Sequence, residues 1–160
     1  MKITVTWGTG TGSTKLSAFD RALWDAGIAN LNLIPLSSVI PPNSYLKVSK
    51  LRSSNSEKNF GKRVYVVLSS MNTTKIGQFV YAGIGWRSVN KTKKGLFVEH
   101  HGRSFEEVKS KITKSLTDMV KYRKEKYGKI EYKIAGIECK SKPVSALVCA
   151  VYQIEPWQTG

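Results

Sequence analysis

The sequence predicts an α+β fold with mostly antiparallel sheets and helices on the outer faces. Segments with strand character outnumber those with helical character. Each of the two helical segments has a single apolar stripe, which suits it to cover one face of a sheet. The chain has 160 residues, 41% of them hydrophobic, with no repeat or linker, so residues 1–160 are expected to form one domain.

The first part of the chain reads as strand, loop, helix and strand. Residues 2–7 alternate polar and apolar side chains with period two, which is typical of a half-buried strand. Residues 8–14 (GTGTGST) are expected to form a loop whose backbone passes close to another part of the molecule. A helix is predicted over residues 15–27, with Ser13 or Thr14 as its N-terminal cap and a glycine suited to cap its C-terminal end. Residues 30–36 predict a second strand, which runs on to a Pro-Pro turn at residues 41–42.

The remainder adds further strands and the longest helix. Residues 51–62 have few large apolar side chains and are expected to form an exposed loop. Ser104 and Glu107 predict a capping box at the start of the helix, which ends before Gly128. Five further strands are predicted, over residues 63–70, 78–89, 96–101, 129–137 and 144–154. The first three of these five should be antiparallel neighbours. The last of the five is nearly continuous in apolar residues and should be central in its sheet.

The chain is strongly basic, with 26 Lys and Arg against 11 Asp and Glu and a formal net charge of +15. Such an excess favours a nucleic acid or an anionic membrane surface as partner. The lysines are nevertheless scattered, and acidic residues lie between them on the long helix, so a solvated basic face is the simpler interpretation. The sequence shows neither an apolar run long enough for a membrane helix nor a signal peptide, so we expect a cytoplasmic protein with no membrane partner.

Three patterns suggest chemistry that their spacing does not support. The glycines of residues 8–12 give G-x-G-x-G, which is neither the dinucleotide fingerprint nor a phosphate-binding P-loop. His100 and His101 are adjacent on a strand and point to opposite faces, so they are not expected to share a metal ion. Cys139 and Cys149 have no zinc or redox spacing and are expected to be buried thiols.

Two features could carry catalysis. Ser37-Ser38 stands where a strand ends and a Pro-Pro turn follows, so the Ser38 hydroxyl could be held against the preceding carbonyl. Taken alone, an ordinary polar strand end is the simpler interpretation, since Ser-Ser also occurs at residues 53–54 and 69–70. Glu99 is preceded by apolar residues that could shield it from water, which would raise its pKa and suit it to donate a proton.

The stretch from Gly8 to Pro42, GTGTGSTKLSAFDRALWDAGIANLNLIPLSSVIPP, resembles the N-terminal signature of the pyruvoyl-dependent arginine decarboxylases. Its glycine segment, A-F-D-x-A-L helix, A-G-I-x-N-x-N-L strand and S-S-x-x-P-P segment occur in order and without gaps. Beyond this stretch the similarity is thinner and rests on residues 82–85 and on L-F-V-E-H-H-G at residues 96–102. The chain departs from the family pattern at Ala29, where a glycine is common, and over residues 45–62.

The resemblance implies a four-layer αββα sandwich that forms a homotrimer, or a dimer of trimers, with active sites between neighbouring subunits. It implies a zymogen that cuts itself between Ser37 and Ser38, giving a β chain of residues 1–37 and an α chain of residues 38–160. Ser38 would become a covalent pyruvoyl group, and no external cofactor would be needed. Through a Schiff base to this group, L-arginine would be decarboxylated to agmatine, a product used in polyamine biosynthesis, and carbon dioxide.

The resemblance also implies roles for individual side chains. Ser38 and Glu99 would be catalytic, with Glu99 returning a proton to the α-carbon of the substrate. Asp20 would contact the guanidinium group, which a carboxylate can bind through two hydrogen bonds. Asn32 and Leu31 would complete the substrate site, and no metal is expected.

Two alternatives remain open at this point: a basic nucleic-acid-binding α+β module, and a pyruvoyl decarboxylase that acts on histidine or lysine. A nucleic-acid binder would lose affinity steeply with salt and would remain one intact chain. A decarboxylase of this type would yield two fragments and release carbon dioxide.

Overall fold

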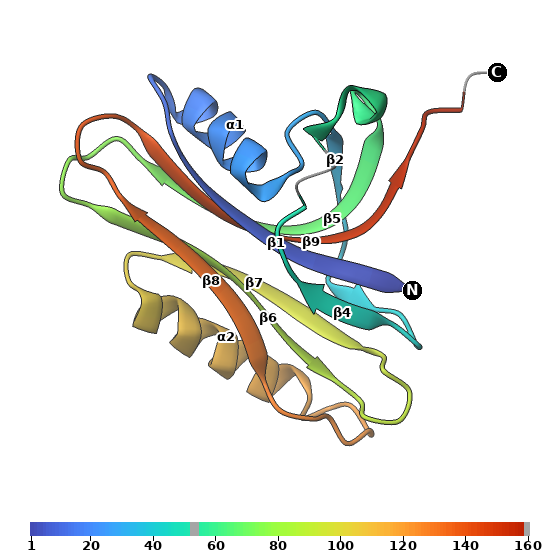
Figure 1. Ribbon diagram of the computed structural model, residues 1–160. Coiled ribbons are helices and arrows are strands. Elements are labelled where there is room, and N and C mark those ends of the chain that lie inside the picture. The colour runs from blue at the N-terminus through green and yellow to red at the C-terminus, as the bar shows by residue number, and fades with distance from the viewer. Residues whose placement is uncertain (52–54, 159–160) are drawn as a thin grey trace.

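A computed structural model describes residues 1–51 and 55–158. The chain folds into four stacked layers in the order helix, sheet, sheet, helix (Figure 1). Helix α1 (Lys15–Ala26) covers the outer face of a five-stranded sheet, and helix α2 (Phe105–Met119) covers the outer face of a four-stranded sheet. The α+β class and the four-layer arrangement are thereby confirmed. Over the described ranges, neither helix is long and apolar enough to cross a membrane.

Most strand pairs are antiparallel, although the five-stranded sheet is mixed. The five-stranded sheet consists, in spatial order, of β2 (Asn32–Pro35), β5 (Arg63–Thr73), β9 (Val144–Glu155), β1 (Lys2–Thr11) and β4 (Tyr45–Val48). The four-stranded sheet consists of β3 (Val39–Ile40), β7 (Gly95–Gly102), β6 (Phe79–Ser88) and β8 (Glu131–Glu138). The β1–β4 and β2–β5 pairs are parallel, and the other pairs are antiparallel. The central position of β9 agrees with its apolar sequence.

Apolar side chains fill the three interfaces between the layers. Leu23 and Ile28 pack on the outer face of the five-stranded sheet, and Ile112 packs on the outer face of the four-stranded sheet. Between the sheets lie Val5 and Phe97, which are fully buried. Burying each such side chain is worth about 1.5–3 kcal/mol, so these interfaces hold the layers in place. Both cysteines are buried and free, as expected.

The glycine segment is part of a strand, so the expected loop over residues 8–14 is wrong for residues 8–11. A Cβ on Gly8 would stand 2.0 Å from the backbone oxygen of Ala22, because α1 crosses directly over β1. The expected close approach of backbone is therefore confirmed. Glycines carry no side chain and so give no period-two signal, which is why the strand could not be followed past Trp7 in the sequence.

The helix ends agree largely with expectation. Thr14 caps α1 by accepting a hydrogen bond from the Ser17 N–H, and Gly27 closes it in the left-handed conformation with φ of 86°. Ser104 accepts from the Glu107 N–H at 3.1 Å at the start of α2. The Glu107 carboxylate accepts from the Arg103 N–H instead of from Ser104, so only half of the predicted capping box forms.

Strand neighbours depart from expectation in one place. Strand β5 pairs with β9 and β2, whereas β6 pairs with β7 and β8, so the predicted adjacency of β5 and β6 within one sheet is wrong. The turn between β5 and β6 carries the chain from one sheet to the other (Figure 1). The expected loop at 51–62 contains a short 3-10 helix, η2 (Glu57–Asn59), and its residues 52–54 lie outside the described residues.

Candidate active site

The chain crosses between the two sheets at residues 36–38. Strand β2 is the edge of the five-stranded sheet and β3 is the edge of the four-stranded sheet, so the crossing segment runs along one side of the sandwich. Ser37 is exposed there and Ser38 is half-buried. Strand β3 is only two residues long and pairs with Leu96 and Gly95, so among the described residues β7 has no strand beside it past this short pairing. The Ser37–Ser38 bond therefore lies at an open edge.

Ser38 is held in an unfavourable backbone conformation by two contacts with β7. Its φ is 41°, in the left-handed region, which costs an L-residue roughly 1–3 kcal/mol. The Ser38 hydroxyl donates to Glu99 Oε2 at 2.8 Å. Its carbonyl oxygen accepts from the Phe97 N–H at 2.9 Å. The two candidate catalytic residues, 61 positions apart in the sequence, are thus in direct contact.

Glu99 is less shielded than its sequence context indicates. Phe97 and Val98 are buried, but the Glu99 side chain is exposed in the single chain. The reason is the short edge strand, since β3 pairs with β7 at Leu96 and Gly95 and does not extend to Glu99. The expectation that apolar neighbours remove Glu99 from water is therefore not met within one chain.

Tyr152 is a site residue that the sequence did not reveal. Along the β5–β9 pair, Tyr65 lies opposite Gln153 and Val66 lies opposite Val151, so Tyr152 is the extra residue of a β-bulge. Its hydroxyl donates to the Val39 carbonyl oxygen at 2.8 Å. Burial and the nearby Glu99 carboxylate raise the pKa of Tyr152, so its hydroxyl keeps its proton and remains a donor. A tyrosine near the end of an apolar strand reads as a core residue, and a bulge leaves no mark in the sequence.

A basic hollow of about 360 Å³ adjoins Glu99 on the side of α2. His100 Nε2 lies 2.8 Å from Ser115 Oγ, and His101 is exposed. Burial is the main cause that lowers the pKa of His100, and the Lys111 ammonium lowers it further. Glu99 is the one carboxylate among the residues that line this hollow, which are Glu99, His100, His101, Lys111, Lys114 and Ser115.

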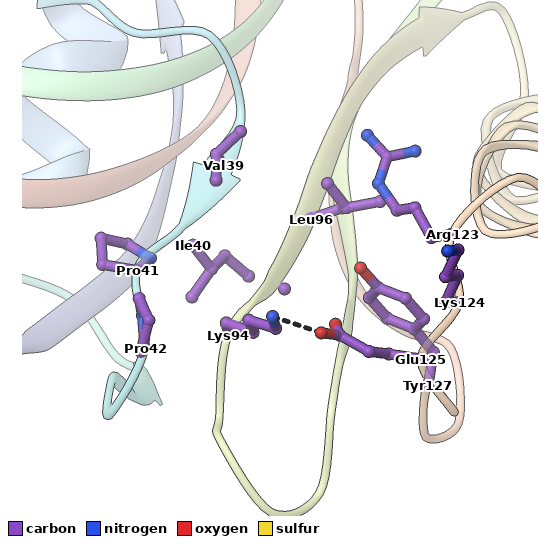
Figure 2. A pocket seen from close by; sticks show the side chains of 11 residues that line it. Val39, Ile40, Pro41, Pro42, Lys94, Leu96, Arg123, Lys124, Glu125 and Tyr127 are labelled. Carbon is purple, nitrogen blue, oxygen red and sulfur yellow. Dashed lines mark ion pairs between the residues drawn. The ribbon is translucent and has the colours of Figure 1, made fainter.

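A second hollow, of about 380 Å³, lies beside β3 on the C-terminal side of Ser38. Figure 2 shows Val39 and Ile40 on one wall and the segment 123–127 on the other. Its one carboxylate, Glu125, is paired with Lys94, as the dashed line in Figure 2 marks. Because Arg123 and Lys124 add two more cations, this hollow is unsuited to a guanidinium group.

The three residues expected to bind the substrate lie apart from Ser38 and Glu99. Asp20 is exposed on α1, and Leu31 is buried between α1 and the five-stranded sheet. The Asn32 side chain donates to the Gly61 carbonyl oxygen at 2.8 Å. Among residues 1–51 and 55–158, no hydrogen bond or ion pair within the chain joins these three residues to Ser38 or Glu99.

Comparison with known proteins identifies the family. Residues 2–153 match the family model described as "Pyruvoyl-dependent arginine decarboxylase". The chain is 33% identical to the pyruvoyl-dependent arginine decarboxylase of Thermococcus sibiricus over 144 residues, which is 88% of this chain and 87% of that protein. It is 31% identical to that of Pyrococcus abyssi over 141 residues, again 88% and 87%.

Among solved structures, the chain is similar to a pyruvoyl-dependent histidine decarboxylase at pH 8, with 11% identity and a TM-score of 0.44 over 64% of this chain and 58% of that one. That likeness is too slight to bear on fold or function. The match to the family model over almost the whole length is decisive. The chain belongs to the pyruvoyl-dependent arginine decarboxylases, a family of enzymes whose cofactor is a covalent pyruvoyl group.

Proposed function

We propose that this chain converts L-arginine to agmatine and carbon dioxide with a pyruvoyl group that it makes from its own Ser38. The observation that carries the proposal is the 2.8 Å hydrogen bond from the Ser38 hydroxyl to Glu99, at the Ser-Ser bond of the family signature. It joins a nucleophile to a group that can take its proton, which is the arrangement that covalent catalysis by a hydroxyl needs.

Self-cleavage requires the Ser38 hydroxyl to attack the Ser37 carbonyl carbon. Glu99 accepts the hydroxyl proton, the Ser38 nitrogen leaves as an amine, and an ester joins Ser37 to Ser38 Oγ. Loss of the Ser38 α-proton then breaks the Cβ–Oγ bond and releases residues 1–37 with a new carboxylate. The dehydroalanine left at residue 38 takes up water and loses ammonia, which gives the pyruvoyl group at the start of residues 38–160.

Position 38 fits such a group. An L-serine with φ of 41° is strained, whereas a pyruvoyl group has a planar α-carbon and no preceding peptide bond, so cleavage removes the strain. The group supplies an electron sink, since its ketone condenses with the substrate amine and its neighbouring amide carbonyl accepts the electrons released as carbon dioxide leaves. The Phe97 N–H already donates to that amide oxygen at 2.9 Å and holds it in position. Glu99, once protonated, is placed to return a proton to the α-carbon.

The guanidinium group needs a carboxylate, and the described part of one chain supplies no free one in the two hollows beside Ser38 and Glu99. The carboxylates of the two hollows are Glu99, which is assigned to proton transfer, and Glu125, which is paired with Lys94. We therefore propose a homotrimer in which Asp20 of a neighbouring subunit reaches the substrate, with Asn32 and Leu31 supporting that part of the site. Helix α1 and strand β3 each carry an exposed apolar side chain, Leu16 at 76% exposure and Val39 at 60%, which suits these two elements to a contact between subunits.

The test is the intact mass of the purified protein together with its activity. We expect two chains, residues 1–37 and 38–160, with the larger one blocked at its N-terminus, and release of carbon dioxide from arginine. Ser38→Ala should abolish both cleavage and activity while the protein stays folded. An active protein with the mass of the uncut chain and a serine at residue 38 would refute the proposal.

A further inference from the structure

We propose that Tyr152 is a positioning residue for self-cleavage, which holds the Val39 carbonyl and so fixes the chain on the C-terminal side of the Ser37–Ser38 bond. The inference rests on the proposed cleavage at that bond. Its basis is the 2.8 Å hydrogen bond from the Tyr152 hydroxyl to the Val39 carbonyl oxygen, which links two residues 113 positions apart.

Over residues 1–51 and 55–158, the Val39 carbonyl has no partner within its own sheet. Successive carbonyls of a strand point to opposite sides, and the Ser38 carbonyl points to β7, where it accepts from Phe97. The Val39 carbonyl therefore points away from β7, and β3 is the edge of its sheet. Tyr152 comes from the other sheet and donates to this oxygen, so a single hydroxyl fastens the edge strand across the sandwich.

The position of the Tyr152 hydroxyl is fixed by rigid surroundings. The Tyr152 side chain continues the alternation of Val148 and Ala150, which face the space between the sheets, and it packs against the central apolar cluster there. Its ring meets the buried Phe97 ring edge to face, with centroids 6.2 Å apart. Phe97 is also the residue whose N–H holds the Ser38 carbonyl, so both hydrogen bonds depend on one packed pair of rings.

Together the two bonds fix consecutive peptide groups after the scissile bond. A non-glycine residue stays at positive φ only when its surroundings hold it there. With the carbonyls of Ser38 and Val39 both held, the strain remains at Ser38 and its hydroxyl stays on Glu99. Without the Tyr152 hydroxyl, the Val39 peptide group can rotate, and Ser38 can relax toward an extended conformation that moves its oxygen off Glu99.

The experiment compares Tyr152→Phe with the parent in the full-length chain. Each protein is synthesised in a short cell-free pulse, and the fraction cleaved is followed over time by mass spectrometry. One lost hydrogen bond of this kind should slow cleavage by roughly three- to tenfold. The matched control is Tyr65→Phe, which removes a 3.3 Å contact with Glu155 elsewhere in the same sheet and should cleave at the parental rate.

A direct readout of the bond separates positioning from general stability. In the uncleavable Ser38→Ala background, the ¹³C resonance of the Val39 carbonyl should shift when Tyr152→Phe is added, while the melting temperature stays close to that of the background. Parental cleavage by Tyr152→Phe overturns the proposal. Slower cleavage with a lower melting temperature and an unmoved Val39 resonance also overturns it, because the effect is then one of stability. If the parent itself stays uncut, the proposed cleavage fails and this role fails with it.

Discussion

Replacing Glu99 by glutamine tests whether one carboxylate serves both self-cleavage and turnover. Glutamine keeps the size of the side chain and can still accept a hydrogen bond from the Ser38 hydroxyl, which lies 2.8 Å from Glu99 Oε2. It cannot take up or return a proton. Positioned proton transfer contributes about 10²–10⁴-fold in rate, or roughly 3–5 kcal/mol of barrier, so we expect cleavage and turnover each to slow at least a hundredfold.

The free energy of unfolding should change little, by about 0.5 kcal/mol or less, because the Glu99 side chain is exposed. Cleavage is measured by mass on freshly made chain, and turnover by carbon dioxide release from the fraction that has cleaved after long incubation, with the pyruvoyl content counted. Glu131→Gln, an exposed glutamate on β8 of the same sheet, is the matched control. Parental rates for both reactions in Glu99→Gln would show that the observed contact has no chemical role.

Three further predictions follow from the structure. Asp20→Asn should leave cleavage intact but reduce kcat/KM for arginine at least about tenfold, since a charged partner is lost; an unchanged kcat/KM would remove Asp20 from the site. Gly8→Ala should lower the free energy of unfolding by roughly 1–3 kcal/mol, because its Cβ would stand 2.0 Å from the Ala22 oxygen; an unchanged urea midpoint would contradict the close packing. Burial lowers the pKa of His100, so its contribution to stability is complete above its ordinary pKa of about 6.5 and is lost as pH falls below it. His100→Gln, which can still bond Ser115, should therefore lose less stability between about pH 7.5 and 5 than the parent, and equal losses in urea titrations would refute this.

Features that depend on neighbours along the chain could be predicted from the amino-acid sequence. The caps at Thr14 and Gly27, the apolar stripes of both helices and the central position of the last strand are encoded within short windows, so periodicity and residue type reveal them. The apolar stripes predicted only that each helix covers one face of a sheet, and the four-layer order was implied by the resemblance to the family. The resemblance to the family rests on one continuous stretch, from Gly8 to Pro42.

Contacts between residues far apart in the chain became known only from the folded structure. Strand pairing is a property of two segments, so β5 could be assigned to the wrong neighbour although its own pattern was clear. The contact of Ser38 with Glu99, the left-handed φ of Ser38 and the hydrogen bond from Tyr152 to Val39 all depend on where the two sheets meet. Side chains gain these partners only when the sheets pack, because burial and register are set by the opposing strand and leave no local trace in the sequence.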